Sequence, residues 1–364
     1  MSLRYGIVGL PNVGKSTLFN ALSDGNAVAA NFPFCTIEPN IGIVTVPDER
    51  MQLLGSLITP QKLTPTTMQF VDIAGLVKGA NQGEGLGNRF LANIREVDAI
   101  VHVIRCFHDD RITHVAGQVD PAFDKEVVDH ELKMKDLETV QKRMAKVDKI
   151  AKAGHKEAQQ ERDLLARLEM HLSQGGSART VAANTSEALL LKSWQLLTLK
   201  PVLYVANVDE PTLQKGTNNH VERLREIIDE EQAEMVVICG TLEAQMAELT
   251  PNEKVPFLKE YGIDNSALAL LINTSYRLLN LITYFTAGPQ EVRAWTISAG
   301  TKAPQAAGVI HSDFEKRFVK AEVIKLPDYL QYKTELACRT AGKVRIEGKS
   351  YVVEDGDIMH FRYA

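Results

Sequence analysis

The chain has 364 residues, of which 45% are hydrophobic and 24% are charged. These values are ordinary for a globular protein of two or three domains, and they exclude general disorder and a fibrous repeat. No uncharged apolar run approaches the ~18 residues of a membrane span, and the first residues lack the pattern of a secretory signal. We therefore expect a cytoplasmic monomer that does not bind membranes. The four cysteines form no CxxC pair, which argues against a zinc site or a disulfide framework.

The net charge of −5 is unevenly distributed along the chain. Residues 133–156 contain eight Lys or Arg against three Asp or Glu, and residues 288–364 have a net charge of +2. A surface that binds polyanions is therefore expected in these two segments rather than across the whole molecule.

Five short apolar runs, rich in Val and Ile, are predicted to be β-strands. Helix-like segments separate several of them, which is the pattern of buried parallel strands in an α/β sheet. The runs are residues 4–9, 68–75, 99–107, 201–208 and 234–240.

Residues 124–173 have a different pattern. Apolar side chains recur every three or four residues, with an interruption at 153–155, which predicts two antiparallel helices joined by a turn. The pair could pack on the sheet as ordinary amphipathic helices. The narrow apolar stripe and the surrounding charge favour a projecting hairpin instead.

The C-terminal residues 288–364 are predicted to form a small α+β module. Strand-like runs separated by turn signals dominate this part of the chain. The runs are 291–298, 318–325, 343–348 and 350–363.

The strongest functional signal is GLPNVGKS at residues 9–16, which matches GxxxxGK[ST] between a predicted strand and a predicted helix. Such a loop directs backbone N–H groups and a helix N-terminus at phosphates. Lys15 would contact the β- and γ-phosphates, and the Ser16 hydroxyl would bind Mg²⁺. The expected nucleotide-binding residues here are Asn12, Val13, Gly14, Lys15, Ser16 and Thr17.

Two further segments are expected to complete the phosphate and magnesium site. Asp72, at the end of a predicted strand, would hold Mg²⁺ through water, and the N–H of Gly75 would sense the γ-phosphate. Thr36 is the candidate for a second hydroxyl ligand. The glycine-rich residues 76–91 favour a nucleotide-controlled switch over a plain surface loop.

Base recognition is expected at Asn207-Val208-Asp209-Glu210, which follows the strand 201–208. Guanine-nucleotide proteins carry Asn-Lys-x-Asp at this place, and their aspartate accepts hydrogen bonds from guanine. Here Val208 replaces the lysine and Glu210 replaces the aspartate, so guanine selectivity is in doubt.

Several segments together resemble the YchF subfamily, the Obg-like ATPases, over essentially the whole chain. They are GLPNVGKST, NFPFCTIEPN, VDIAGLVKGANQGEGLGNRFL, NVDE, FEKRFVKAEVI and EDGDIMHFRY. The resemblance implies an α/β fold with a Ras-like P-loop G domain (1–123 and 200–287). It also implies a helical coiled-coil insertion (124–199) and a C-terminal ubiquitin-like TGS domain of the β-grasp type (288–364).

The same resemblance implies a function. It predicts slow hydrolysis of ATP, preferred over GTP, and a nucleotide-dependent switch in translation or stress response. The expected partner is the ribosome, as the large subunit or the whole particle, contacted at an RNA surface. Asn207 and Val208 would line the adenine site, and Phe107 would pack near the base.

The catalytic group is less obvious from the sequence. The residue after Gly75 is Leu76, which cannot orient a water molecule as the glutamine of Ras-like enzymes does. His114, beyond the strand 99–107, is the candidate that we choose instead. Asn12 is a candidate for holding K⁺, with loop shaping as the alternative, and Cys35 is a candidate for redox control.

Three other functions fit parts of the sequence. A P-loop kinase would need an acceptor pocket and a basic lid, and no arginine-rich lid is evident. A plain RNA-binding protein could use nucleotide only structurally. A GTP-binding, RNA-associated regulatory protein is the alternative closest to the favoured interpretation.

Overall fold

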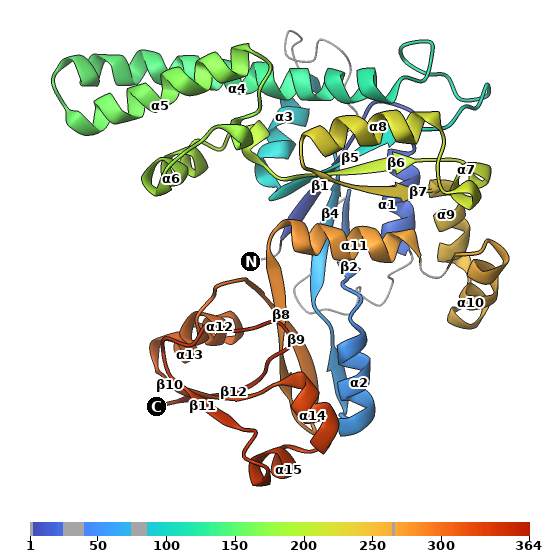
Figure 1. Ribbon diagram of the computed structural model, residues 1–364, viewed down its shortest axis with the longest axis vertical. Coiled ribbons are helices and arrows are strands. Elements are labelled where there is room, and N and C mark those ends of the chain that lie inside the picture. Colours follow the sequence, from blue (N-terminus) through green and yellow to red (C-terminus); the bar gives the residue numbers. More distant parts are fainter. Residues whose placement is uncertain (1–2, 25–39, 74–85, 264–265) are drawn as a thin grey trace. The chain divides into compact units, whose positions relative to one another are not determined.

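The computed structural model describes residues 3–24, 40–73, 86–263 and 266–364 (Figure 1). The chain forms two compact units, the first from Met1–Val44 and Gln69–Leu271, the second from Thr45–Met68 and Ile272–Ala364. This division differs from the three parts expected from the sequence. The helical residues 124–199 belong to the same unit as the phosphate loop, and residues 45–68 belong with the C-terminal residues.

The first unit contains a six-stranded sheet whose strand order is β2-β4-β1-β5-β6-β7. β1 pairs in parallel with β4 and β5, β5 with β6, and β6 with β7, so the predicted parallel α/β sheet is confirmed. Every residue of β5 and β6 is buried, which explains why these runs are continuously apolar. The strands are β1 (Arg4–Val8), β2 (Ile41–Thr45), β4 (Thr67–Asp72), β5 (Ala99–Arg105), β6 (Val202–Asn207) and β7 (Glu234–Ile238).

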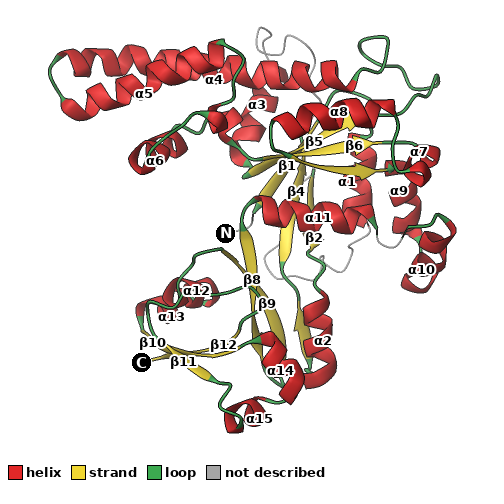
Figure 2. Ribbon diagram, in the orientation of Figure 1, coloured by secondary structure: helices red, strands yellow, loops and turns green. Residues whose placement is uncertain are grey.

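Some helices of this unit lie on both sides of the sheet, and others extend away from it (Figure 2). They are α1 (Lys15–Asp24), α3 (Leu86–Glu96), α4 (Pro121–Lys152), α5 (Lys156–Ser173), α6 (Thr185–Ser193), α7 (Glu210–Lys215), α8 (Asn219–Glu230), α9 (Gly240–Glu248) and α10 (Pro251–Glu260). Two 3-10 turns, η2 (Ala178–Thr180) and η3 (Leu197–Leu199), precede β6, and α11 (Ala267–Leu278) contains the boundary between the units. Among the described helices, none combines the length and apolar composition needed to cross a membrane.

The predicted helical hairpin is formed by α4 and α5, with the turn at residues 153–155. Its apolar stripe packs into a cluster of its own, together with side chains of the following segment 178–196, and this cluster includes no strand residue. Figure 1 shows the far half of the hairpin extending beyond the sheet of this unit. The structure therefore agrees with a projecting hairpin rather than with a helix pair lying on the sheet.

The second unit contains a mixed sheet in the order β11-β10-β12-β8-β9-β3. β3 pairs in parallel with β9, and α2 packs Met51 and Leu54 against Phe285 and Val292. The elements are α2 (Glu49–Ile58), β3 (Lys62–Thr64), β8 (Leu281–Ala287), β9 (Glu291–Ser298), α12 (Ala303–Ile310), α13 (Ser312–Lys316), β10 (Phe318–Ile324), α14 (Leu326–Tyr332), α15 (Glu335–Thr340), β11 (Arg345–Glu347) and β12 (Ile358–Tyr363).

A buried carboxylate fixes α4 to the segment that leads into β6. Asp136 is 1% exposed and accepts hydrogen bonds from the N–H groups of Leu197 and Thr198 and from the Thr198 hydroxyl, each at 2.7 Å. Three donors satisfy a charge that would otherwise be costly to bury.

Replacing Asp136 by alanine should lower the free energy of unfolding by about 2–4 kcal/mol, because two buried N–H groups would be left without an acceptor. Urea unfolding followed by far-UV circular dichroism measures this. Asp148→Ala, at a partly buried position of the same helix, is the control and should change stability by less than about 0.5 kcal/mol. Equal effects of the two substitutions would contradict the role assigned to Asp136.

Candidate nucleotide-binding site

The phosphate loop lies between β1 and α1, as the sequence predicts. Gly14 has a φ of 93°, and a Cβ atom at this position would lie 2.1 Å from Nδ2 of Asn207. Glycine is therefore required here both by the backbone conformation and by the close approach of a side chain. α1 begins at Lys15, and Ser16 is exposed in its first turn.

Lys15 and Asp72 are 57 residues apart in sequence but form an ion pair, with 2.8 Å between Nζ and Oδ1. β1 and β4 are adjacent parallel strands, so their carboxyl ends bring the phosphate loop and Asp72 to the same edge of the sheet. The expected phosphate-binding cation and one expected magnesium ligand thus lie together. The exposed Ser16 hydroxyl and the Asp72 carboxylate are hard oxygen donors, so the residues present fit Mg²⁺.

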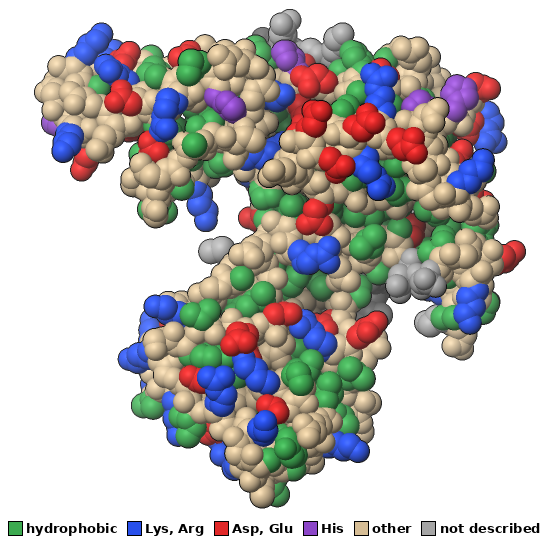
Figure 3. All heavy atoms as spheres, in the orientation of Figure 1, with side chains coloured by type: hydrophobic (Ala, Val, Ile, Leu, Met, Phe, Trp, Pro, Cys, Tyr) green, Lys and Arg blue, Asp and Glu red, His purple; other side chains and the backbone are tan. Residues whose placement is uncertain are grey.

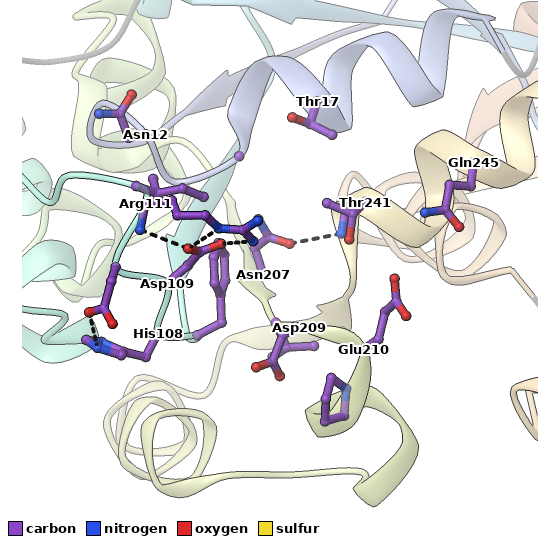
Figure 4. Close-up of a pocket in the computed structure, with 17 residues that line it drawn as sticks. Asn12, Thr17, His108, Asp109, Arg111, Asn207, Asp209, Glu210, Thr241 and Gln245 are labelled. Atoms are coloured by element: carbon purple, nitrogen blue, oxygen red, sulfur yellow. Dashed lines mark hydrogen bonds and ion pairs between the residues drawn. The ribbon is translucent and has the colours of Figure 1, made fainter.

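A cavity of about 790 Å³ opens beside the phosphate loop (Figure 4). Its volume lies in the usual range for small-molecule sites. It is lined by Asn12, Gly14, Thr17, Phe107, His108, Asp109, Asp110, Arg111, Ile112, Asn207, Val208, Asp209, Glu210, Pro211, Gly240, Thr241 and Gln245. The structure therefore brings the expected base-site residues Phe107, Asn207 and Val208 into one cavity with the phosphate loop.

Asn207 lies at the end of β6 and uses both ends of its amide. Its Nδ2 donates to the carbonyl of Val13 at 2.8 Å, and its Oδ1 accepts from the N–H of Gly240 at 3.0 Å. The side chain is 7% exposed. It therefore joins the phosphate loop to the start of α9 in addition to lining the cavity.

The two residues that depart from the guanine pattern have different environments. Val208 is 2% exposed, and its N–H donates to the carbonyl of Ile238 at 2.8 Å. Asp209 and Glu210 both line the cavity, and Asp209 also caps α7 by accepting from the N–H of Thr212 (Figure 4). No lysine covers the cavity at position 208, and the carboxylate at position 210 is one methylene longer than aspartate.

Arg105, which no sequence motif marks as functional, supports one wall of the cavity. It is 1% exposed at the end of β5, and its guanidinium donates to three backbone carbonyls at 3.0–3.1 Å: those of Phe107, Asp109 and Ile112. The guanidinium carbon also lies 4.7 Å from the centre of the Phe107 ring. The sequence feature that could have indicated its importance is a charged residue at the end of a mostly apolar strand.

The same loop carries a second arginine interaction inside the cavity. Arg111 donates to both carboxylate oxygens of Asp109, at 3.0 and 2.9 Å (Figure 4). These hydrogen bonds lower the pKa of Asp109 to about 2, so it remains ionised at neutral pH.

His114 is buried and does not line the cavity. Its Nε2 lies 2.9 Å from Oδ2 of Asp124, and its Nδ1 accepts from the N–H of Ala116 at 3.2 Å, which together fix Nε2 as the protonated nitrogen. Burial raises the pKa of Asp124, and the hydrogen bond from His114 opposes this. Both ring nitrogens are thus occupied, and a catalytic role for His114 stays a prediction that requires the loop to move.

Asn12 connects the phosphate loop to the segment that carries His114. It adopts a φ of 62°, and its Nδ2 donates to the carbonyl of Thr113 at 3.1 Å. Its proposed role in binding K⁺ stays a prediction. Thr36, Gly75, Leu76 and Cys35 lie outside the described residues, as does most of the predicted switch.

The sheet, the phosphate loop and the adjoining cavity define a P-loop nucleotide-binding protein. Residues 4–150 match a family model described as "50S ribosome-binding GTPase", and residues 281–364 match the YchF-GTPase C-terminal family, described as a protein of unknown function.

Two curated relatives are each 52% identical to this chain. "Ribosome-binding ATPase YchF" of Haemophilus ducreyi aligns with 100% of this chain and 99% of its own length. The protein with the same description from Bacillus subtilis aligns with 100% of this chain and 100% of its own length. The chain therefore belongs to the YchF family.

Solved structures agree with this assignment. The Schizosaccharomyces pombe YchF GTPase matches with a TM-score of 0.91 and 40% identity, covering 99% of this chain and 98% of that one. A GTP-binding protein from Pyrococcus horikoshii, at 19% identity and a TM-score of 0.61 over the full length of both chains, shares the fold.

Replacing Arg105 by lysine should weaken nucleotide binding about tenfold, because an ammonium group cannot donate to three carbonyls in the plane of the loop. Calorimetric titration with nucleotide measures this. Arg111→Lys is the control for the same change of side chain in this loop, since the Arg111 hydrogen bonds in the described structure go to the Asp109 carboxylate and not to backbone carbonyls. If Arg105→Lys binds nucleotide normally, the loop does not depend on the buried guanidinium.

Proposed function

We propose that this chain is a ribosome-binding ATPase that binds ATP with Mg²⁺, prefers ATP over GTP and hydrolyses it slowly as a nucleotide-dependent switch. The observation that carries the proposal is the cavity beside the phosphate loop, in which Val208 and Glu210 replace the residues that read guanine. The descriptions of its relatives as ribosome-binding ATPases support the same function.

The residues of the site suggest how phosphates are held. Lys15 would leave Asp72 and place its charge at the β- and γ-phosphates, while the N–H groups at the start of α1 point to the same anion. Bound Mg²⁺ would neutralise phosphate charge, held by Ser16, by Asp72 through water and by Thr36. The N–H of Gly75 would report the γ-phosphate, and Asn12 would hold K⁺ where this ion is used.

The base would lie between the 107–112 loop and the start of α9. Phe107 offers an aromatic surface, and Val208 leaves the site without the lysine that covers guanine. The relatives differ in the nucleotide that their names specify, because the Schizosaccharomyces pombe relative is called a GTPase and the bacterial relatives are called ATPases. A GTP-binding, RNA-associated regulatory protein is therefore the second candidate.

ATP should bind at least tenfold more tightly than GTP when both are titrated with Mg²⁺ in a calorimeter. Equal affinity for the two nucleotides, or tighter binding of GTP, would favour the second candidate.

Lys15→Ala should weaken ATP binding by about 10–100-fold in the same titration, since it removes a charge-assisted hydrogen bond to the phosphates. Normal ATP turnover by Lys15→Ala would contradict the whole assignment.

His114→Ala should lower kcat about 100-fold with little change in KM, if the imidazole orients the attacking water after the loop moves. Steady-state turnover of ATP measures this, with and without ribosomes. Urea unfolding of the same variant is the necessary companion, because His114 also bonds to Asp124 at the start of α4. Unchanged kcat together with lower stability would leave His114 only the structural role.

A further inference from the structure

Two buried side chains, His114 and Asp124, form a pair close in sequence to the loop that lines the nucleotide cavity. Figure 3 shows histidine side chains at the surface of the first unit, whereas His114 is 8% exposed and Asp124 is 1% exposed. Ile112, two residues before His114, does line the cavity. The imidazole is therefore held in the interior, a short distance along the chain from the proposed nucleotide site.

The carboxylate of Asp124 has few hydrogen-bond partners. Its Oδ2 lies 2.9 Å from Nε2 of His114, and its Oδ1 is buried without a hydrogen-bond partner among the described residues. The other ring nitrogen of His114 accepts a longer bond, of 3.2 Å, from the N–H of Ala116. Departure of His114 would therefore leave both carboxylate oxygens of Asp124 without a partner.

Such a state is unfavourable, because a buried charge needs hydrogen bonds or an opposite charge. Burial raises the pKa of Asp124, and the hydrogen bond from His114 opposes this. The charges of Asp120 and Arg105 act on Asp124 in opposite directions. The bond to His114 thus stabilises the carboxylate, and a movement of the loop that breaks this bond has a cost.

Asp124 is also fixed in place, because it lies in the first turn of α4. The next residue, Lys125, forms ion pairs with Asp129 at 2.6 Å and with Glu231 at 2.5 Å. The start of α4 is therefore attached to the body of its unit. Movement of His114 into the nucleotide cavity must break its bond to Asp124 rather than carry Asp124 with it.

We propose that Asp124 is a positioning residue that holds His114 outside the nucleotide cavity, so that breaking their bond limits the rate of ATP hydrolysis. This inference rests on the proposed function, in which His114 orients the attacking water. In the described state both ring nitrogens are occupied and the imidazole does not line the cavity. A weaker bond should therefore raise the rate, whereas loss of a purely structural contact would lower it or leave it unchanged.

The test compares Asp124→Asn with Asp120→Asn in the full chain. Both changes replace a carboxylate by an amide of the same shape at the start of α4. Asp120 caps this helix by accepting from the N–H groups of Ala122 and Phe123, and asparagine caps helices equally well, so this variant is the matched control. Asp124→Asn is also combined with His114→Ala. Steady-state ATP turnover without ribosomes and urea unfolding are measured on the same samples.

Asp124→Asn should raise kcat about tenfold with KM within about twofold, because the imidazole would no longer bond to a charged acceptor. Asp120→Asn should stay within about twofold of the unchanged protein in both constants. In the His114→Ala background, Asp124→Asn should leave kcat unchanged, since there is no imidazole to release. Asp124→Ala, which removes both oxygens, should raise kcat at least as much as Asp124→Asn.

A spectroscopic measurement tests the same bond in the unchanged protein. A buried, hydrogen-bonded Nε2–H exchanges slowly with water and gives its own proton resonance in nuclear magnetic resonance spectra, which is identified by its absence from His114→Ala. This resonance should be present without nucleotide. It should disappear when ADP, Mg²⁺ and aluminium fluoride, which together mimic the transferring phosphoryl group, are bound. Its persistence in that complex would overturn the proposal, whatever the stability of the variants.

The turnover results separate this proposal from the proposed function. If turnover depends on His114 but Asp124→Asn lowers kcat or leaves it unchanged, the positioning role is wrong and the ATPase proposal stands. An increase in kcat that persists in the His114→Ala background would also overturn the positioning role, because the effect would not act through the imidazole. Absence of turnover from both the unchanged protein and Asp124→Asn would overturn the two proposals together.

Discussion

The nucleotide site depends on one side chain, the amide of Asn207. It connects the phosphate loop, through the carbonyl of Val13, to the N–H of Gly240 at the start of α9. Both bonds are made by a buried group at the end of an interior strand, so they fix the phosphate loop relative to the start of α9, in addition to the packing of α1 against α9. The close approach of this amide also explains why position 14 must be glycine.

Another wall of the cavity depends on a buried arginine, Arg105, which forms no ion pair at short range with a carboxylate of the described residues. Three carbonyl groups and an aromatic face contact the Arg105 guanidinium, and the carboxylates of Asp109 and Asp124 interact with it at longer range. A buried cation is costly, but a guanidinium can spread its charge over several acceptors in one plane. The loop from Phe107 to Ile112 therefore folds around its own arginine, leaving the carboxylates of Asp109 and Asp110 at the cavity.

The sequence predicts those features that depend on local order. The phosphate loop, the buried parallel strands and the hairpin all follow from spacing and composition over short windows, and the structure contains them. The sequence also predicts that Lys15 and Asp72 lie close together, because one comes after β1 and the other ends β4, and the structure joins them in an ion pair.

Features that depend on distant contacts could not be predicted in this way. Nothing in residues 45–68 indicates that β3 pairs with β9, since the pairing joins segments more than 200 residues apart. The chemistry of His114 makes it a catalytic candidate, yet its contacts with Asp124 and Ala116 depend on where α4 begins. The sequence predicts a hairpin over 124–173, but not that Asp136 binds residues 197 and 198, because these contacts join positions 61 and 62 residues apart.

One helix, α4, joins the nucleotide site to the projecting hairpin. Asp124, in the first turn of α4, bonds to His114, whose neighbour Thr113 accepts a hydrogen bond from Asn12 in the phosphate loop. Asp136 fixes the same helix to residues 197–198. It lies about 18 Å along the helix axis from Asp124 and about 15 Å from Lys146. The start of this helix is held as well, because Lys125 forms ion pairs with Asp129 of the same helix and with Glu231, which follows α8. α4 is therefore anchored to the body of its unit at two places, and the part of the hairpin beyond Asp136 is the part that projects from the sheet (Figure 1).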